Sequence, residues 1–190
     1  PLEPRRVTLS ETKRFYHEDN FARSPQLNMV WPTLEQYTDD AYALDFLAQL
    51  LSDGKKAPMY KVLVKEKELT SRVTAYNNSQ ELAGEFHVIV TANGVNNLDD
   101  VESSVLESFK KFEEEGITDK DVERIKAGLE TGFYNSISSV LGKSFQLAQY
   151  NVFAGDPGFI TEDIENVKKV TKEDVTRVYN RYIKGKPYVI

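Results

Sequence analysis

The chain carries few residues whose type and spacing favour catalysis. Its two histidines, His17 and His87, each stand alone in a strand-like segment. Neither HExxH nor HxxEH occurs, the patterns in which two imidazoles one helical turn apart hold Zn²⁺ beside a carboxylate base. We therefore expect no catalytic residue and no metal ligand in this chain. The weaker alternative is a metal site assembled from both histidines and distant carboxylates.

Other nucleophilic and phosphate-binding patterns are also missing. There is no cysteine, which excludes disulfides, thiol nucleophiles and thiolate metal ligands. No GxSxG nucleophile elbow occurs, and Gly54-Lys55-Lys56 lacks the glycine spacing of a phosphate loop. None of the many Ser and Thr residues is therefore marked as an activated nucleophile.

Adjacent carboxylates could suggest acid–base chemistry or Ca²⁺ binding. We interpret them instead as solvated helix faces, because acids stabilise the positive end of a helix dipole. The groups are Asp39-Asp40, Asp99-Asp100 and Glu113-Glu114-Glu115. A set of aromatic residues at helical spacings is interpreted as core or helix–helix contact: Phe133, Tyr134, Phe145, Tyr150 and Phe153.

The totals are those of an ordinary globular domain. The chain has 190 residues, of which 40% are hydrophobic and 28% charged, so one domain over residues 1–190 is expected. A net charge of −6 without a Lys/Arg cluster disfavours nucleic acid as a partner. No stretch approaches a membrane span, and residues 1–4 lack the apolar core of a signal peptide. The missing initial Met and the strand-like Tyr188-Val189-Ile190 predict a fragment of a longer protein.

Hydrophobic periodicity changes along the chain from strand to helix spacing. Strands are predicted near residues 5–17, 26–31, 70–76, 86–92 and 187–190, with Pro32 ending the second and a turn at Asn77 to Gln80. Helices are predicted from Thr38 to Gly54, from Pro58 to about Lys67, over 98–115, from Asp119 to about Val140, and over 145–153, 161–167 and 172–183. In the hairpin, Phe86, Val88 and Val90 should face the helices.

Two helix starts share one pattern. Thr118 and Thr171 each follow an apolar residue and precede an aspartate at the third helical position. We interpret this as capping chemistry used twice rather than as an internal repeat. Together these elements predict an α+β fold, an antiparallel-rich sheet with helices packed on one face.

One long segment, Leu50 to Ala92, matches a known pattern: a helix ending in a glycine turn, then L-V-x-E-x-x-L-A-x-x-V-x-A and a strand. The matching residues are Leu51, Gly54, Met59-Tyr60, Leu63-Val64, Glu66, Leu69, Val73 and Ala75. The flanking segments PLEPRRVTLSETKRF, GITDKDVERIKAGL and VTKEDVTRVYNRYI agree as well. The chain thus resembles the non-catalytic second domain of the pitrilysin/insulinase (M16) family of zinc metallopeptidases. The resemblance implies the same α+β fold, that of a metallohydrolase-like domain as in the mitochondrial processing peptidases.

The resemblance also gives a meaning to LVKEKELTSRV, residues 63–73. The substrate-anchoring version of this segment has an Arg after the leucine and a Tyr seven residues later, and here those positions are Val64 and Ser71. We therefore expect Leu63, Val64 and Leu69 to pack a helix and strand, with the charged residues 65–68 on the solvated side.

By resemblance, the chain is a structural and substrate-chamber domain of a zinc metalloendopeptidase. The resemblance implies a preceding HxxEH catalytic domain as partner, zinc in that parent enzyme but none here, and a peptide substrate. The alternative is an assembly or peptide-binding subunit that has lost catalysis altogether. An upstream HxxEH would support the first interpretation and its absence the second.

Overall fold

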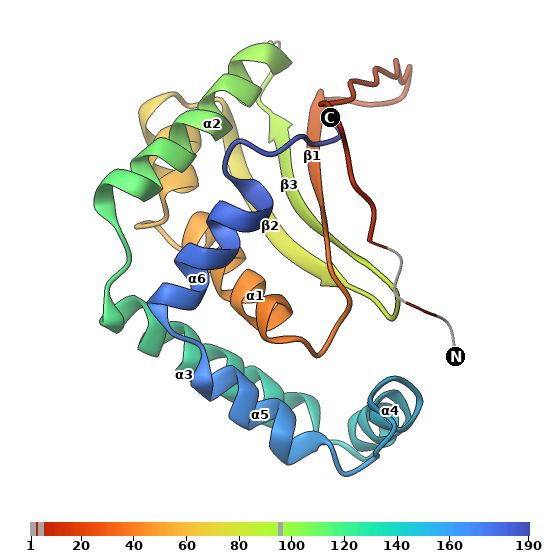
Figure 1. The fold of residues 1–190 in the computed structure, drawn as a ribbon. Coiled ribbons are helices and arrows are strands. Elements are labelled where there is room, and N and C mark those ends of the chain that lie inside the picture. Colours follow the sequence, from red (N-terminus) through yellow and green to blue (C-terminus); the bar gives the residue numbers. More distant parts are fainter. Residues whose placement is uncertain (1–2, 4–5, 95–96) are drawn as a thin grey trace.

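The computed structural model describes residue 3, residues 6–94 and residues 97–190. Within them, β1 (Gln26–Thr33), β2 (Thr70–Ser79) and β3 (Gly84–Ala92) form an antiparallel sheet in the order β1-β3-β2. Most of the helices lie on one face of this sheet (Figure 1). The predicted α+β class is thereby confirmed. Most of residues 1–5, including the segment compared with a signal peptide, lies outside the described residues.

The hairpin of β2 and β3 faces the helices in the predicted register. Phe86, Val88 and Val90 are fully buried, whereas their neighbours His87 and Ile89 are half-buried on the other face. Across the sheet these three residues pair with inward-facing residues of β1: Trp31, Met29 and Leu27, respectively. Apolar cross-strand pairs of this kind fix the register, because a slip of one residue would turn each of them to the open face.

The helices follow the predicted order. Their bounds are α1 (Asp39–Ser52), η1 (Tyr60–Glu66), α2 (Leu98–Glu115), α3 (Asp119–Ser136), α4 (Val140–Gln149), η2 (Tyr150–Ala154), α5 (Ile160–Lys169), α6 (Lys172–Val178) and η3 (Tyr179–Ile183). The η segments are π-helical, and η2 and η3 directly continue α4 and α6. Helix α3 ends earlier than predicted, because Ser139 caps a new helix by accepting a hydrogen bond from the Gly142 amide.

The shared capping pattern is confirmed. Thr118 accepts a hydrogen bond from the Asp121 amide, and the Asp121 carboxylate accepts one from the Thr118 amide. Thr171 and Asp174 form the same capping box at the start of α6. Each box satisfies amides that a helix start leaves without partners.

Three predictions at the sheet margins were wrong. Residues 6–17 form no strand. Lys13 bridges Val189 and the Phe15 amide donates to the Ile190 carbonyl, while Val189 also bridges Val30. Residues 187–190 therefore contact the sheet at isolated points. Pro32 does not end β1, because β1 is an edge strand in which a missing N–H removes no ladder hydrogen bond.

The predicted turn also lies later than expected. Asn77 still belongs to β2 and pairs with Phe86, and the turn is closed by a hydrogen bond from the Gln80 amide to the Ala83 carbonyl. The side-chain amide of Asn77 donates a hydrogen bond to Asp45 of α1 at 3.2 Å. This contact stabilises Asn77 at a strand position, where the sequence predicted a turn.

Candidate functional site

The segment of residues 63–73 packs as its pattern predicts. Leu63 is fully buried, and Val64 and Leu69 are half-buried against the core. The charged residues 65–68 are exposed, and two of them pair with α2: Lys67 Nζ lies 2.5 Å from Glu107, and Glu66 pairs with Lys111. This segment joins η1 to β2, and its ion pairs hold the end of η1 against α2.

The two histidines lie apart from any cluster of metal-binding side chains. His17 is exposed in the segment before β1, and His87 on β3 stacks on Tyr76 with ring centroids 4.7 Å apart. The Nε2 atom of His87 lies 3.0 Å from a carboxylate oxygen of Glu85. Among residues 3, 6–94 and 97–190, no three His, Cys, Asp or Glu side chains converge as metal ligands. These residues do not fit a catalytic zinc ion.

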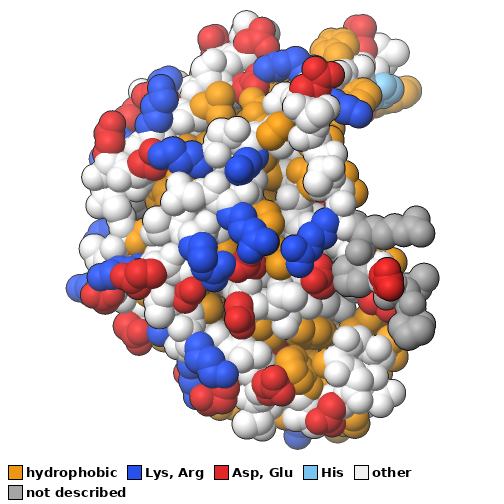
Figure 2. All heavy atoms as spheres, in the orientation of Figure 1, with side chains coloured by type: hydrophobic (Ala, Val, Ile, Leu, Met, Phe, Trp, Pro, Cys, Tyr) orange, Lys and Arg blue, Asp and Glu red, His pale blue; other side chains and the backbone are white. Residues whose placement is uncertain are grey.

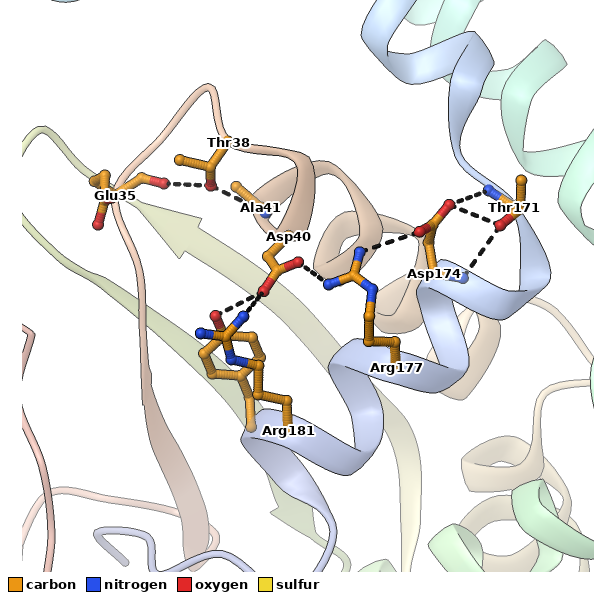
Figure 3. Close-up of polar contacts among 9 residues, drawn as sticks. Glu35, Thr38, Asp40, Ala41, Thr171, Asp174, Arg177 and Arg181 are labelled. Atoms are coloured by element: carbon orange, nitrogen blue, oxygen red, sulfur yellow. Dashed lines mark hydrogen bonds and ion pairs between the residues drawn. The ribbon is translucent and has the colours of Figure 1, made fainter.

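Asp40 departs from the prediction of a solvated helix start. It is buried, and its carboxylate accepts hydrogen bonds from Arg177, from Arg181 Nη1 at 2.9 Å and from the Tyr182 hydroxyl at 2.8 Å (Figure 3). Arg177 also donates to Asp174, the capping residue of α6, at 3.1 Å. The first turn of α1 is therefore covered by α6 and η3, from which these side chains come.

Several forces act on the Asp40 carboxyl. Burial alone would raise the pKa of Asp40, but hydrogen bonds from Arg177 and Tyr182, with the charges of Arg177 and Arg181, outweigh burial and lower it. Asp40 therefore stays ionised at neutral pH. The other adjacent carboxylates, Asp99-Asp100 and Glu113 to Glu115, are exposed as predicted.

A cleft of about 540 Å³ opens between α1, the hairpin end of β2, α3 and α5. Its polar lining includes Asp45, Asn77 and Asp163, and none of its lining residues is Lys, Arg or His. Burial raises the pKa of Asp45 to about 7, although the hydrogen bond from Asn77 favours the charged form. The cleft is therefore lined by acidic and amide side chains without a basic one.

Asp163 links three of the elements around this cleft by hydrogen bonds. Its carboxylate accepts hydrogen bonds from the Tyr42 hydroxyl at 2.5 Å and the Tyr150 hydroxyl at 2.6 Å. Burial, followed by these contacts with Asp163, raises the pKa of both tyrosines. The two phenols therefore stay protonated and link α1, η2 and α5 through one carboxylate.

Sequence reasoning missed both acids of the cleft. Asp45 had a signal, since it stands within the apolar stripe of α1, where a charged residue is unusual. Asp163 had none, because the first turn of a helix commonly carries an acid. Only the approach of η2 and α1 to α5 brings tyrosine hydroxyls to it.

The aromatic residues predicted as core divide into two groups. Tyr150 is fully buried, Phe133 is half-buried, and the prediction is confirmed for both. It was wrong for Tyr134, Phe145 and Phe153, which are exposed. Their helical spacing could not reveal which side of the helix the rest of the domain covers.

Within the described residues, no helix is both long and apolar enough to cross a bilayer.

The zinc protease PqqE of Helicobacter pylori (strain ATCC 700392 / 26695) is 25% identical to this chain over 147 residues. These cover 76% of this chain and 32% of the relative, so the chain spans about a third of that relative's length.

Solved structures share the fold. A protease from Helicobacter pylori superposes with a TM-score of 0.82 at 20% identity, over 94% of this chain and 43% of that one. A peptidase M16 inactive domain from Pseudomonas fluorescens gives a TM-score of 0.71 at 16% identity, over 99% of this chain and 43% of that one. The model of the family described as peptidase M16 inactive domain matches residues 1–129. The chain therefore belongs to the peptidase M16 inactive domain family, as its sequence pattern predicted.

Proposed function

We propose that this domain is the non-catalytic half of a zinc metalloendopeptidase and forms part of the wall of its substrate chamber. The observation that carries the proposal is the match of an inactive-domain family to a chain without HxxEH. Val64 and Ser71, which replace the Arg and Tyr of the substrate-anchoring version, support the same role. The domain has no catalytic residue, cofactor or metal of its own in this proposal.

The companion half would carry HxxEH, its downstream glutamate ligand and the zinc ion. When bound there, zinc would polarise the scissile carbonyl of a peptide and activate water. The described residues would contribute a structural support, because the sheet and the helices on it share one apolar core, whose members include Leu27, Val88 and Ile183. In this proposal residues 1–190 form one domain of a longer chain.

The test compares the 190-residue chain with the longer protein that contains it. Both are chelated, re-dialysed against zinc, analysed for metal and assayed for peptide cleavage. We expect one zinc per molecule and cleavage only in the longer protein, with cleavage lost when the glutamate of HxxEH is replaced by Gln. One tightly held zinc in the 190-residue chain, with cleavage lost on His17→Ala or His87→Ala, would overturn the proposal. A longer protein without HxxEH would favour the assembly or peptide-binding role.

A further inference from the structure

Helix α4 turns an apolar side away from the domain. Leu141 and Phe145 of α4 are 67% and 68% exposed, and Val152 of η2, which continues α4, is 66% exposed. The side that faces the domain instead carries Gly142 and Gln146, which are both half-buried. Tyr150, which follows α4 directly, is fully buried. An amphipathic helix on a protein surface normally shows the reverse arrangement, with its apolar side inward.

The segment around α4 is also nearly free of charge. Residues 131–155 contain a single charged residue, Lys143, whereas 28% of the whole chain is charged. In Figure 2 charged side chains gather over α2, α3, α5 and α6, and the area over α4 at the lower right is mostly white and orange. Depletion of charge together with exposed aromatic and aliphatic side chains is the composition of an interface core.

The apolar surface continues beyond α4 through Phe153 of η2. Phe153 lines a groove of about 690 Å³ together with Val30 and Pro32, which stand on the face of β1 opposite the helices, and Leu82 of the hairpin turn. We name the set of Leu141, Phe145, Val152 and Phe153 the α4 surface. These four residues are exposed within one stretch of 13 residues in α4 and η2, and exposed apolar residues gathered in this way mark an interaction site, whereas scattered ones need no partner.

We infer that the α4 surface is the docking surface for the companion half of the same longer protein. The inference rests on the proposed function, which identifies that half as the HxxEH domain. A surface with so few charges suits a permanent partner, because obligate interfaces are more apolar than transient ones. The relatives are long enough to contain such a partner domain, since this chain spans only 32% of the Helicobacter pylori zinc protease and 43% of the structure with a TM-score of 0.82.

The test places a photo-crosslinking amino acid at position 145 of the longer protein. The matched control carries it at Leu106, which is exposed on α2 outside the α4 surface. We expect crosslinks from position 145 to peptides of the companion half, found by mass spectrometry within a single chain, and none from position 106. Leu141→Asp should lower the yield from position 145 about tenfold, because it places an unpaired charge in the interface core.

The outcomes separate this inference from the proposed function. Crosslinks from position 145 to a second copy of the chain, or a yield no higher than that from position 106, overturn the inference. Zinc content and cleavage are measured on the same protein without the crosslinker. A protein that lacks both, but crosslinks from position 145 to its companion half, would sink the proposed function and leave the docking surface in place.

Discussion

At the scale of single residues, Asp45 shows how burial controls the charge of the cleft. Its carboxyl lies between α1 and β2, with Asn77 as a hydrogen-bond donor. Because burial raises the pKa of Asp45 to about 7, the charge of the cleft changes close to neutral pH. A carboxyl of this kind costs stability when it ionises.

The prediction for Asp45 follows from proton linkage. The unfolded carboxyl, with an ordinary pKa of 3.8, releases its proton well before the folded one, so the contribution of Asp45 to wild-type stability should fall as pH rises from about 4 to about 7. Asp45→Asn should lack this fall and be more stable at pH 8 by roughly 2–4 kcal/mol. Urea unfolding between pH 4 and pH 8 checks this, with the exposed Asp39→Asn in the same helix as control. Equal pH profiles for wild type and Asp45→Asn would contradict the raised pKa.

At the scale of secondary-structure elements, the hairpin gives the sharpest test of register. Val88 is fully buried between β1 and β2, opposite Met29 and Ala75. Val88→Asp should destabilise the domain by more than about 3 kcal/mol, because the carboxylate would be buried without a partner. Thr91→Asp, at an exposed position of the same strand, should change stability by only about 0.5 kcal/mol. Thermal unfolding of both variants is the measurement, and similar shifts in Tm would refute the register.

Local patterns predicted these elements because their causes are local. The capping boxes at Thr118 and Thr171 depend on residues three positions apart, and the burial of Phe86 follows from the alternation of one strand. The π-helical form of η1 was not predictable, since its residues also suit an α-helix. Exposed Phe145 shows the same limit, because periodicity gives a stripe without saying what covers it.

At the scale of the whole molecule, the decisive contacts join segments far apart in sequence. Asp40 near the start of α1 meets side chains of α6 and η3, and Glu102 of α2 accepts hydrogen bonds from Arg14 and Tyr188. Neither set of contacts could be predicted from the sequence, since Asp40 resembles any acid in the first turn of a helix and Glu102 any acid on a helix face. Their burial depends on where the later helices pack.

Asp40→Asn tests the contact between α1 and the last helices. The substitution should lower the free energy of unfolding by about 2 kcal/mol at pH 7, because it removes a charged acceptor from Arg177, Arg181 and Tyr182. Since the folded-state pKa of Asp40 is lowered from 3.8, this advantage of the wild type should shrink as pH falls below about 4. Denaturant unfolding at pH 7 and pH 3 provides the measurement. Its neighbour Asp39→Asn, exposed at the same helix start, should match wild type within about 0.5 kcal/mol at both pH values, and an equal loss there would refute the role of the network.

The bridge between Val30 and Val189 has a consequence for the order of events during synthesis. The Val30 amide donates to the Val189 carbonyl at 2.8 Å, and the Val189 amide donates back at 2.9 Å. Nearly the whole domain must therefore have left the ribosome before this part of the outer edge of β1 can be covered. Until then the nascent sheet presents an open edge to which another extended chain could add. Residues 188–190 therefore cover this edge late in synthesis and protect it from aggregation.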